Sequence, residues 1–194
     1  MQKSQYQPIF ATKLQAAGVK DCKQLSDKKV LLLEEVIKEN VVDSAVLELK
    51  PHIYNMRYEQ VKAEGDNLNQ LLGYGHVAAL SQVLERHQAC KGALIDQFTQ
   101  SKAVLNSLKA KFPAMTFKQQ PKAESDLAVA AASVLARAKF LRSMDELAVL
   151  AGEEELPKGG GDLATECAKR IAVKLGKEEL RKFVKVHFAN YQKI

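Results

Sequence analysis

Several features are missing from this sequence of 194 residues, and each absence excludes a class of protein. No apolar run approaches the about 18 residues of a membrane-spanning helix, and the first residues, MQKSQYQPIF, contain no stretch as apolar as a secretory signal. The three cysteines are scattered and form no CxxC pair, which argues against a disulfide framework and against a zinc site. We therefore expect a cytoplasmic protein that has no membrane partner.

The common catalytic and nucleotide-binding motifs are also absent. The sequence has no GxGxxG or GxxxxGKS loop, and GGGD at residues 159–162 lacks the strand-then-helix context of a phosphate-binding loop. The four histidines form no HExxH motif, and none is obviously paired with a serine or cysteine nucleophile. An α/β nucleotide-binding domain would require a phosphate loop that this sequence does not contain.

Positive charge is present in excess and is clustered. Lys and Arg number 29 against 23 Asp and Glu, and residues 168–194 alone hold eight Lys or Arg against two Glu. Residues 102–122 hold five lysines and no acid. Such clusters attract a polyanion through the release of its counterions. A solvated helix face produces the same pattern, so composition alone leaves both interpretations open.

Hydrophobic periodicity predicts strands that alternate with helices, which is typical of an α/β domain with helices packed on a sheet. Helices are predicted over residues 26–40, 65–88, 101–111 and 124–152, with a helical turn at 53–58 and two basic helices after residue 161. Ser26 is the expected N-cap of the first helix, and Gly152 is the expected end of the fourth. Strands are predicted over residues 41–51, 92–98 and 115–120.

Two carboxylates stand at the ends of predicted elements. Asp96 ends the apolar strand GALID, and Glu124 begins the alanine-rich helix, where its spacing from Leu127 and Ala131 places it on the buried face. Each has an ordinary explanation, as a solvated strand end or as an acid that the helix dipole favours. If both lie at one end of the sheet, their oxygens are suited to Mg²⁺ or Mn²⁺. Two acids are too few for a complete two-metal site.

Five segments, in the expected order, resemble the catalytic domain of the ribonuclease HII/HIII family, and specifically its HIII branch. They are GVKDCKQLSDKK at 18–29, ALIDQF at 93–98, KAESDLAVAAASVLARAKFLRSMD at 122–145, ELPKGGG at 155–161 and KVHFAN at 185–190. The resemblance extends over residues 8–194. It implies a ribonuclease H-like α/β fold, in which a mixed sheet is flanked by helices. It also implies an endonuclease that hydrolyses the RNA strand of RNA–DNA hybrids with Mg²⁺ or Mn²⁺.

The resemblance also implies roles for individual residues. Asp96 and Glu124 would be two of four metal-binding carboxylates, with Asp126 as the fallback for the fourth. Contacts to the backbone of the hybrid are expected from three lysines: Lys23, Lys122 and Lys158. His187, within KVHFAN, is expected to pack in the fold or to contact a phosphate of the substrate.

Four departures from the family pattern qualify these expectations. Cys22 stands where the family has a serine. LPKGGG lacks the tyrosine of the HII branch, and this absence favours the HIII assignment and cleavage within longer RNA tracts. The first acidic pair of the family, in a D-E-x-G-x-G-D-x-F-G segment, has no counterpart in these residues, nor does the N-terminal substrate-binding domain. We therefore expect residues 1–194 to form a single, N-terminally truncated catalytic domain that is monomeric and impaired in cleavage. The alternatives are a non-catalytic hybrid-binding protein and an inert fragment.

Overall fold

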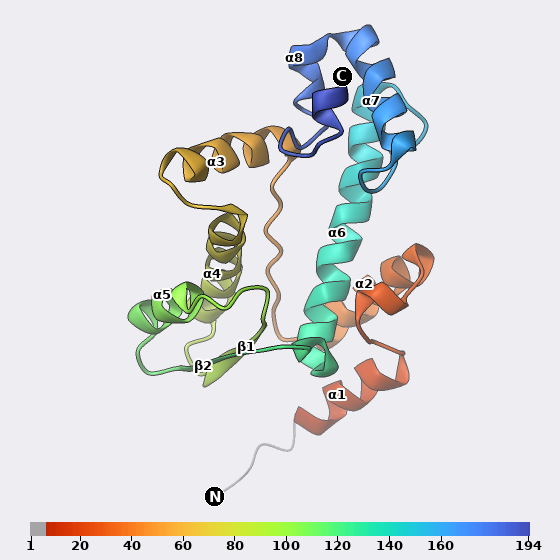
Figure 1. Ribbon diagram of the computed structural model, residues 1–194. Helices are drawn as coiled ribbons and strands as arrows, with labels where there is room; N and C mark the ends of the chain where they lie inside the picture. Colours follow the sequence, from red (N-terminus) through yellow and green to blue (C-terminus); the bar gives the residue numbers. More distant parts are fainter. Residues whose placement is uncertain (1–6) are drawn as a thin grey trace, which may run out of the picture. The chain divides into compact units, whose positions relative to one another are not determined.

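The computed structural model describes residues 7–194, and its chain forms two compact units. The first unit comprises the described part of Met1–Leu47 together with Leu72–Lys139, and the second comprises Glu48–Leu71 and Phe140–Ile194. The α-helices of Figure 1 are α1 (Gln7–Ala16), α2 (Asp27–Asn40), α3 (Pro51–Ala63), α4 (Leu68–Arg86), α5 (Ala103–Lys111), α6 (Leu127–Ala151), α7 (Asp162–Leu175) and α8 (Lys177–Leu180). The 3-10 turns are η1 (Cys22–Gln24), η2 (Ala123–Ser125) and η3 (Tyr191–Lys193). No helix in residues 7–194 is both long enough and apolar enough to span a membrane.

The sheet of the first unit consists, within the described residues, of β1 (Gly92–Asp96) and β2 (Thr116–Gln120). The two strands are parallel, with Gly92 paired to Thr116 and Asp96 paired to Gln120. A β-carbon at position 92 would collide with the carbonyl oxygen of Thr116, so the close approach of the strands requires glycine there. The predicted α/β class is confirmed, and within the described residues the sheet is a small parallel one.

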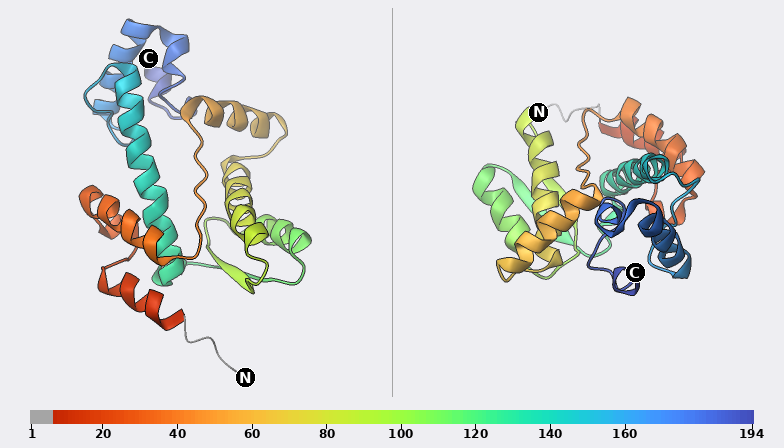
Figure 2. Two further views of the ribbon diagram at one scale, coloured as in Figure 1. Left: turned by 180° about the vertical axis from the view of Figure 1, so that it is seen from behind. Right: turned by 90° about the horizontal axis from the view of Figure 1, so that it is seen from above.

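The two faces of this sheet differ in character because side chains alternate along a strand. One face, with Ile95 and Phe117, is buried against Leu84 of α4 and against Val104 and Leu108 of α5. These two helices lie together beside the strands in Figure 2. We call the opposite side the open face; its members are Leu94, Asp96, Thr116, Lys118 and Gln120. Hydrophobic burial therefore fixes which side of the sheet Asp96 occupies.

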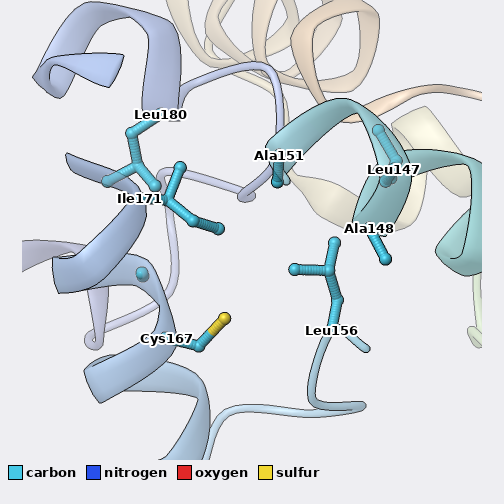
Figure 3. Close-up of a cluster of buried hydrophobic side chains, with 8 residues drawn as sticks. Leu147, Ala148, Ala151, Leu156, Cys167, Ile171 and Leu180 are labelled. Carbon is cyan, nitrogen blue, oxygen red and sulfur yellow. The ribbon is translucent and has the colours of Figure 1, made fainter. Parts of the chain in front are cut away.

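The second unit has its own hydrophobic core, drawn in Figure 3. The C-terminal turns of α6 pack against α7 and the end of α8, and Gly152 ends α6 with φ of +67°, as the sequence predicts. The buried members of this core are Leu147, Ala148, Ala151, Leu156, Cys167, Ala168, Ile171 and Leu180. Since α7 buries one face and exposes the other, its lysines and arginines remain at the surface.

A buried asparagine fixes the C-terminal segment, residues 181–194, within the second unit. Asn55 of α3 is only 2% exposed, and its amide donates hydrogen bonds to the carbonyl oxygens of Arg181 (3.0 Å) and Val184 (2.9 Å). Its side-chain oxygen accepts a hydrogen bond from the backbone N–H of Val186 (3.0 Å). One side chain thus satisfies three main-chain groups in a stretch that has no regular secondary structure.

Several sequence predictions need correction. Residues 41–50 are extended but form no strand, because they have no ladder partner within the described chain. Asp43 instead connects them to the end of α4 through ion pairs with Arg86 (2.8 Å) and His87 (3.0 Å). The pKa of Asp43 is lowered to about 2, mainly because its carboxylate accepts a hydrogen bond from Arg86. The turn predicted at 53–58 is the full helix α3, α1 was not predicted, and the second basic helix ends at Leu180.

Candidate functional site

Asp96 and Glu124 lie at the same edge of the sheet. Parallel strands end at a common edge, so β1 delivers Asp96 to the edge where β2 leaves for η2. The carboxylate oxygen Oδ1 of Asp96 accepts a hydrogen bond from the backbone N–H of Ala123 (3.0 Å), the residue before Glu124. Ala123 is completely buried, which anchors this junction. The two acids that the sequence singled out are therefore neighbours in the fold.

Glu124 does not occupy the position that its spacing suggested. It lies in the 3-10 turn η2, and α6 begins only at Leu127. Its side chain is partly buried, and the oxygen Oε2 is buried with no hydrogen-bond partner. A buried carboxylate oxygen without a partner is costly, and a bound cation would remove that cost. This oxygen is therefore a suitable ligand for a divalent metal ion.

Asp126, the fallback for the fourth acid, has a structural role. Its side chain accepts a hydrogen bond from the backbone N–H of Ala128 (2.9 Å) at the start of α6, as an N-cap residue does. Glu124 has no such structural partner for Oε2. The choice of Glu124 over Asp126 thus agrees with the geometry of the turn.

The ligand set that these residues provide is partial. Within residues 7–194, no group of three or more His, Cys, Asp or Glu side chains is arranged to hold a metal ion. Asp96 and Glu124 supply hard oxygen donors, which match Mg²⁺ and Mn²⁺ in chemical type. They fit one side of a metal site and leave the remaining ligands to other groups.

A pocket of about 390 Å³ opens beside Glu124 in the first unit. Its walls include Lys20, Asp21 and Gln24 from the segment around η1, and Lys122 and Glu124 from the segment after β2. The pocket therefore brings two lysines next to two carboxylates. This mixture of charges suits a phosphate group that approaches acids through a bound cation.

Lys23 lies within the same η1 turn, and its side chain is exposed. The turn is held by Asp21, whose carboxylate accepts the backbone N–H of Lys23 (3.1 Å). The N–H of Cys22 donates to the hydroxyl of Ser133 on α6 (3.2 Å), so the side chain at position 22 is not needed for this contact. The replacement of the family serine by Cys22 therefore leaves the turn attached to α6.

Lys122 has a left-handed backbone, with φ of 54° and ψ of 34°. Among the described residues it is the one non-glycine residue with positive φ. This conformation costs an L-residue about 1–2 kcal/mol and turns the chain from β2 into η2. Backbone strain of this kind is often retained where a side chain has a function.

We expect Lys122→Asn to separate the two roles of this residue. Asparagine tolerates the left-handed region better than lysine, so thermal unfolding should occur at the same temperature or a few degrees higher. Affinity for an RNA–DNA hybrid should fall, because the ammonium group is lost. Melting curves and hybrid titrations on the same preparations measure both effects, and unchanged affinity would make Lys122 purely structural.

His76 of α4 was not recognised from the sequence, although it lies close to Asp96. Its ring stacks on that of Phe98, with centroids 4.7 Å apart and planes 11° apart. Burial lowers the pKa of His76, and the negative charge of Asp96 opposes this effect. No spacing rule connects residues 76 and 96, so this contact becomes visible only when α4 is placed on the sheet.

Lys158 and His187 belong to the second unit. Lys158 lies in the glycine-rich loop before α7 and forms an ion pair with Glu155 (3.8 Å). The ring of His187 packs against Tyr54 (5.4 Å), Tyr58 (4.9 Å) and Phe188 (4.4 Å). Burial, with a smaller effect of Lys185, lowers the pKa of His187, and its Nδ1 is buried without a partner. The packing role fits this environment, and a contact to the hybrid stays a prediction.

The excess positive charge resides in the first unit. This unit contains sixteen Lys and Arg against ten Asp and Glu, whereas the second contains thirteen of each. Four of the eight basic C-terminal residues are paired within their own unit: Lys169 with Glu166, Arg170 with Glu153, Arg181 with Glu59, and Lys182 with Glu179. The cluster that stood out in the sequence thus lies in a unit whose charges balance, and the surplus lies in the unit that contains Asp96 and Glu124.

Comparisons with known proteins show the family of this chain. The family model for Ribonuclease HII matches residues 6–191. This chain belongs to the ribonuclease HII family. Ribonuclease HIII of Protochlamydia amoebophila (strain UWE25) is 39% identical over 177 residues, which cover 91% of this chain and 56% of that protein. Ribonuclease HIII of Oceanobacillus iheyensis is 35% identical over 196 residues, which cover 95% of this chain and 62% of that protein.

Solved structures give the same result. The crystal structure of Bst-RNase HIII in complex with Mn²⁺ matches with a TM-score of 0.83 at 31% identity, covering 95% of this chain and 60% of that one. The predicted family and the ribonuclease H-like fold are therefore confirmed. The chain spans about 60% of the length of the relatives that it matches.

Proposed function

We propose that this chain contributes to hydrolysis of the RNA strand of RNA–DNA hybrids, with Asp96 and Glu124 as ligands of Mg²⁺ or Mn²⁺. The observation that carries the proposal is the junction at the sheet edge. Asp96 is oriented by the N–H of Ala123, and the next residue holds a buried carboxylate oxygen that no protein group satisfies. Membership of the ribonuclease HII family and the Mn²⁺ complex of Bst-RNase HIII support it.

In this proposal each site residue of the first unit has a distinct role. The N–H of Ala123 holds one oxygen of Asp96 and leaves the other for a cation. Lys122, and Lys23 on the η1 turn, bind phosphates of the substrate on either side of Glu124. A divalent ion bound by the two acids would lower the pKa of a water molecule and stabilise the leaving 3′-oxygen. Lys158 and His187 are proposed contacts from the second unit.

According to this proposal, a polypeptide of these 194 residues by itself binds the metal ions weakly. Two divalent ions carry a formal charge of plus four, whereas Asp96 and Glu124 supply minus two. Within residues 7–194 no third acid joins them. The same observation favours the alternative function, which is binding of the hybrid without cleavage. Monomeric state, a single domain and a cytoplasmic location stay predictions.

Metal binding tests the proposal directly. Mn²⁺ titrated into the isotopically labelled chain should broaden the amide signals of residues around 96 and 122–125, because a paramagnetic ion relaxes nearby nuclei. Asp96→Asn and Glu124→Gln should each abolish this local broadening, since each removes one charged ligand. Asp126→Asn is the matched control, because it removes the same charge from the same turn and leaves an N-cap residue in place.

The pattern across the three variants decides the outcome. Broadening that persists in Asp96→Asn and Glu124→Gln would remove these residues from the metal site. Broadening lost only in Asp126→Asn would reassign the fourth acid.

A further inference from the structure

The open face of the sheet presents a lysine on the same side as Asp96. Lys118 is paired with Leu94, and Gln120 with Asp96, so the side chains of all four residues project to one side of β1 and β2. Phe117, directly before Lys118 in the sequence, points the other way, into the core under α5. Thr116, Lys118 and Gln120 are exposed, whereas Phe117 is buried.

The charge around Lys118 is not compensated. Residues 97–123 contain five lysines and no Asp or Glu. Lys111 forms an ion pair with Glu85 (2.6 Å), but Lys118 forms none with any residue of the described chain. Lys109 is also exposed, but it belongs to α5, the helix that covers the opposite face of the sheet. Lys118 is therefore the uncompensated lysine that shares a face with the proposed metal ligand.

We propose that Lys118 binds a phosphate of the RNA strand, and that the open face guides this strand into the site at Asp96. This inference rests on the proposed function and adds a substrate-binding residue to it. Along a strand, two residues span about 6.6 Å, which is the separation of Lys118 from the level of Asp96. Lys118 is thus close enough to Asp96 for one RNA strand to contact both residues on the same face.

Gln120 extends the polar row of β2 to the level of Asp96. Its position opposite Asp96 places a carboxamide, which both donates and accepts hydrogen bonds, beside the proposed metal ligand. A strand with alternating exposed residues Thr116, Lys118 and Gln120 is thus polar along the whole length of β2. An extended polyanion matches such a row better than a compact ligand does, because the charge and the polar groups follow a line.

The experiment measures hybrid binding without cleavage. A labelled RNA–DNA hybrid is titrated with the chain in EDTA at salt concentrations from about 50 to 200 mM, where phosphate contacts dominate the affinity. Lys118→Ala should weaken binding several-fold at the lowest salt and reduce the slope of log K against log salt by about 1. Lys109→Ala should leave the slope unchanged, although it removes the same charge from the same segment. Lys118→Arg should restore the slope.

Two results would overturn the inference. Equal losses of slope in Lys118→Ala and Lys109→Ala would mean that the hybrid senses net charge and not the open face, while the proposed function would stand. Absence of hybrid binding by the unaltered chain would overturn the proposed function together with this inference. Circular dichroism of each variant verifies that the fold is intact, which both exposed positions should permit.

Discussion

A polypeptide of these 194 residues should cleave an RNA–DNA hybrid at least about 10³-fold more slowly than a version extended to include the first acidic segment of the family. The extension is the D-E-x-G-x-G-D-x-F-G segment, with its strands, placed ahead of residue 1. Asp96 and Glu124 alone leave two divalent ions half-neutralised, so either the attacking water or the leaving oxygen lacks its cation. Loss of that stabilisation raises the activation free energy by several kcal/mol, and each increase of roughly 1.4 kcal/mol lowers the rate tenfold.

The assay compares both polypeptides with Mg²⁺ and with Mn²⁺ on a hybrid that carries a long RNA tract. Asp96→Asn in the extended version should remove the gain, whereas Asp126→Asn should keep most of it. Solubility should also improve on extension, because added strands pair with sheet edges that are otherwise unpaired. Strong metal-dependent cleavage by the 194 residues, abolished by Asp96→Asn, would show that another acid completes the site. The proposal of an incomplete ligand set would then be wrong.

Local sequence signals predicted the elements that local interactions determine. Ser26 accepts the N–H of Lys29 (3.3 Å) at the start of α2, as its position before an apolar periodic segment indicated. The strand at 92–96 and the turn at Gly152 follow from an apolar run and from a glycine at a helix end. The proximity of Asp96 and Glu124 was also predictable, because parallel strands end at the same edge of a sheet and Glu124 follows the end of β2 closely.

Other features depend on tertiary partners that a pattern does not reveal. Residues 41–50 alternate like a strand, but a strand exists only where another strand pairs with it, and the tether of Asp43 to Arg86 replaces that pairing. Spacing placed Glu124 in the first turn of α6, since a 3-10 turn before a helix looks the same in sequence.

Ion pairs and ring stacking also depend on partners that are distant in sequence. The C-terminal basic cluster looked unbalanced because its acidic partners, among them Glu59 and Glu153, are distant in sequence. His76 meets Phe98 only because α4 packs on the sheet. Residues that act across long sequence separations therefore require the fold before they can be assigned.

Replacement of Asn55 by alanine should lower the free energy of unfolding by about 3 kcal/mol. The substitution removes three hydrogen bonds at a site that is 2% exposed. It also leaves the carbonyls of Arg181 and Val184 and the N–H of Val186 without their partner. Each bond contributes about 1 kcal/mol, and buried groups without partners add to the loss. Chemical denaturation measures the change, with Asn106→Ala, on the exposed side of α5, as the control that should change stability by less than about 0.5 kcal/mol.

The loss of stability should be concentrated in the C-terminal segment, because the three hydrogen bonds of Asn55 all go to residues 181–186. Hydrogen exchange should therefore accelerate most at the N–H of Val186 and its neighbours, with little change in β1 and β2. Asn55→Asp keeps the acceptor for Val186 but turns a carboxylate toward two carbonyl oxygens, so it should be more destabilising at neutral than at acid pH, where protonation restores a donor. Uniform acceleration of exchange across the chain, or unchanged protection at Val186, would mean that Asn55 does not hold the segment.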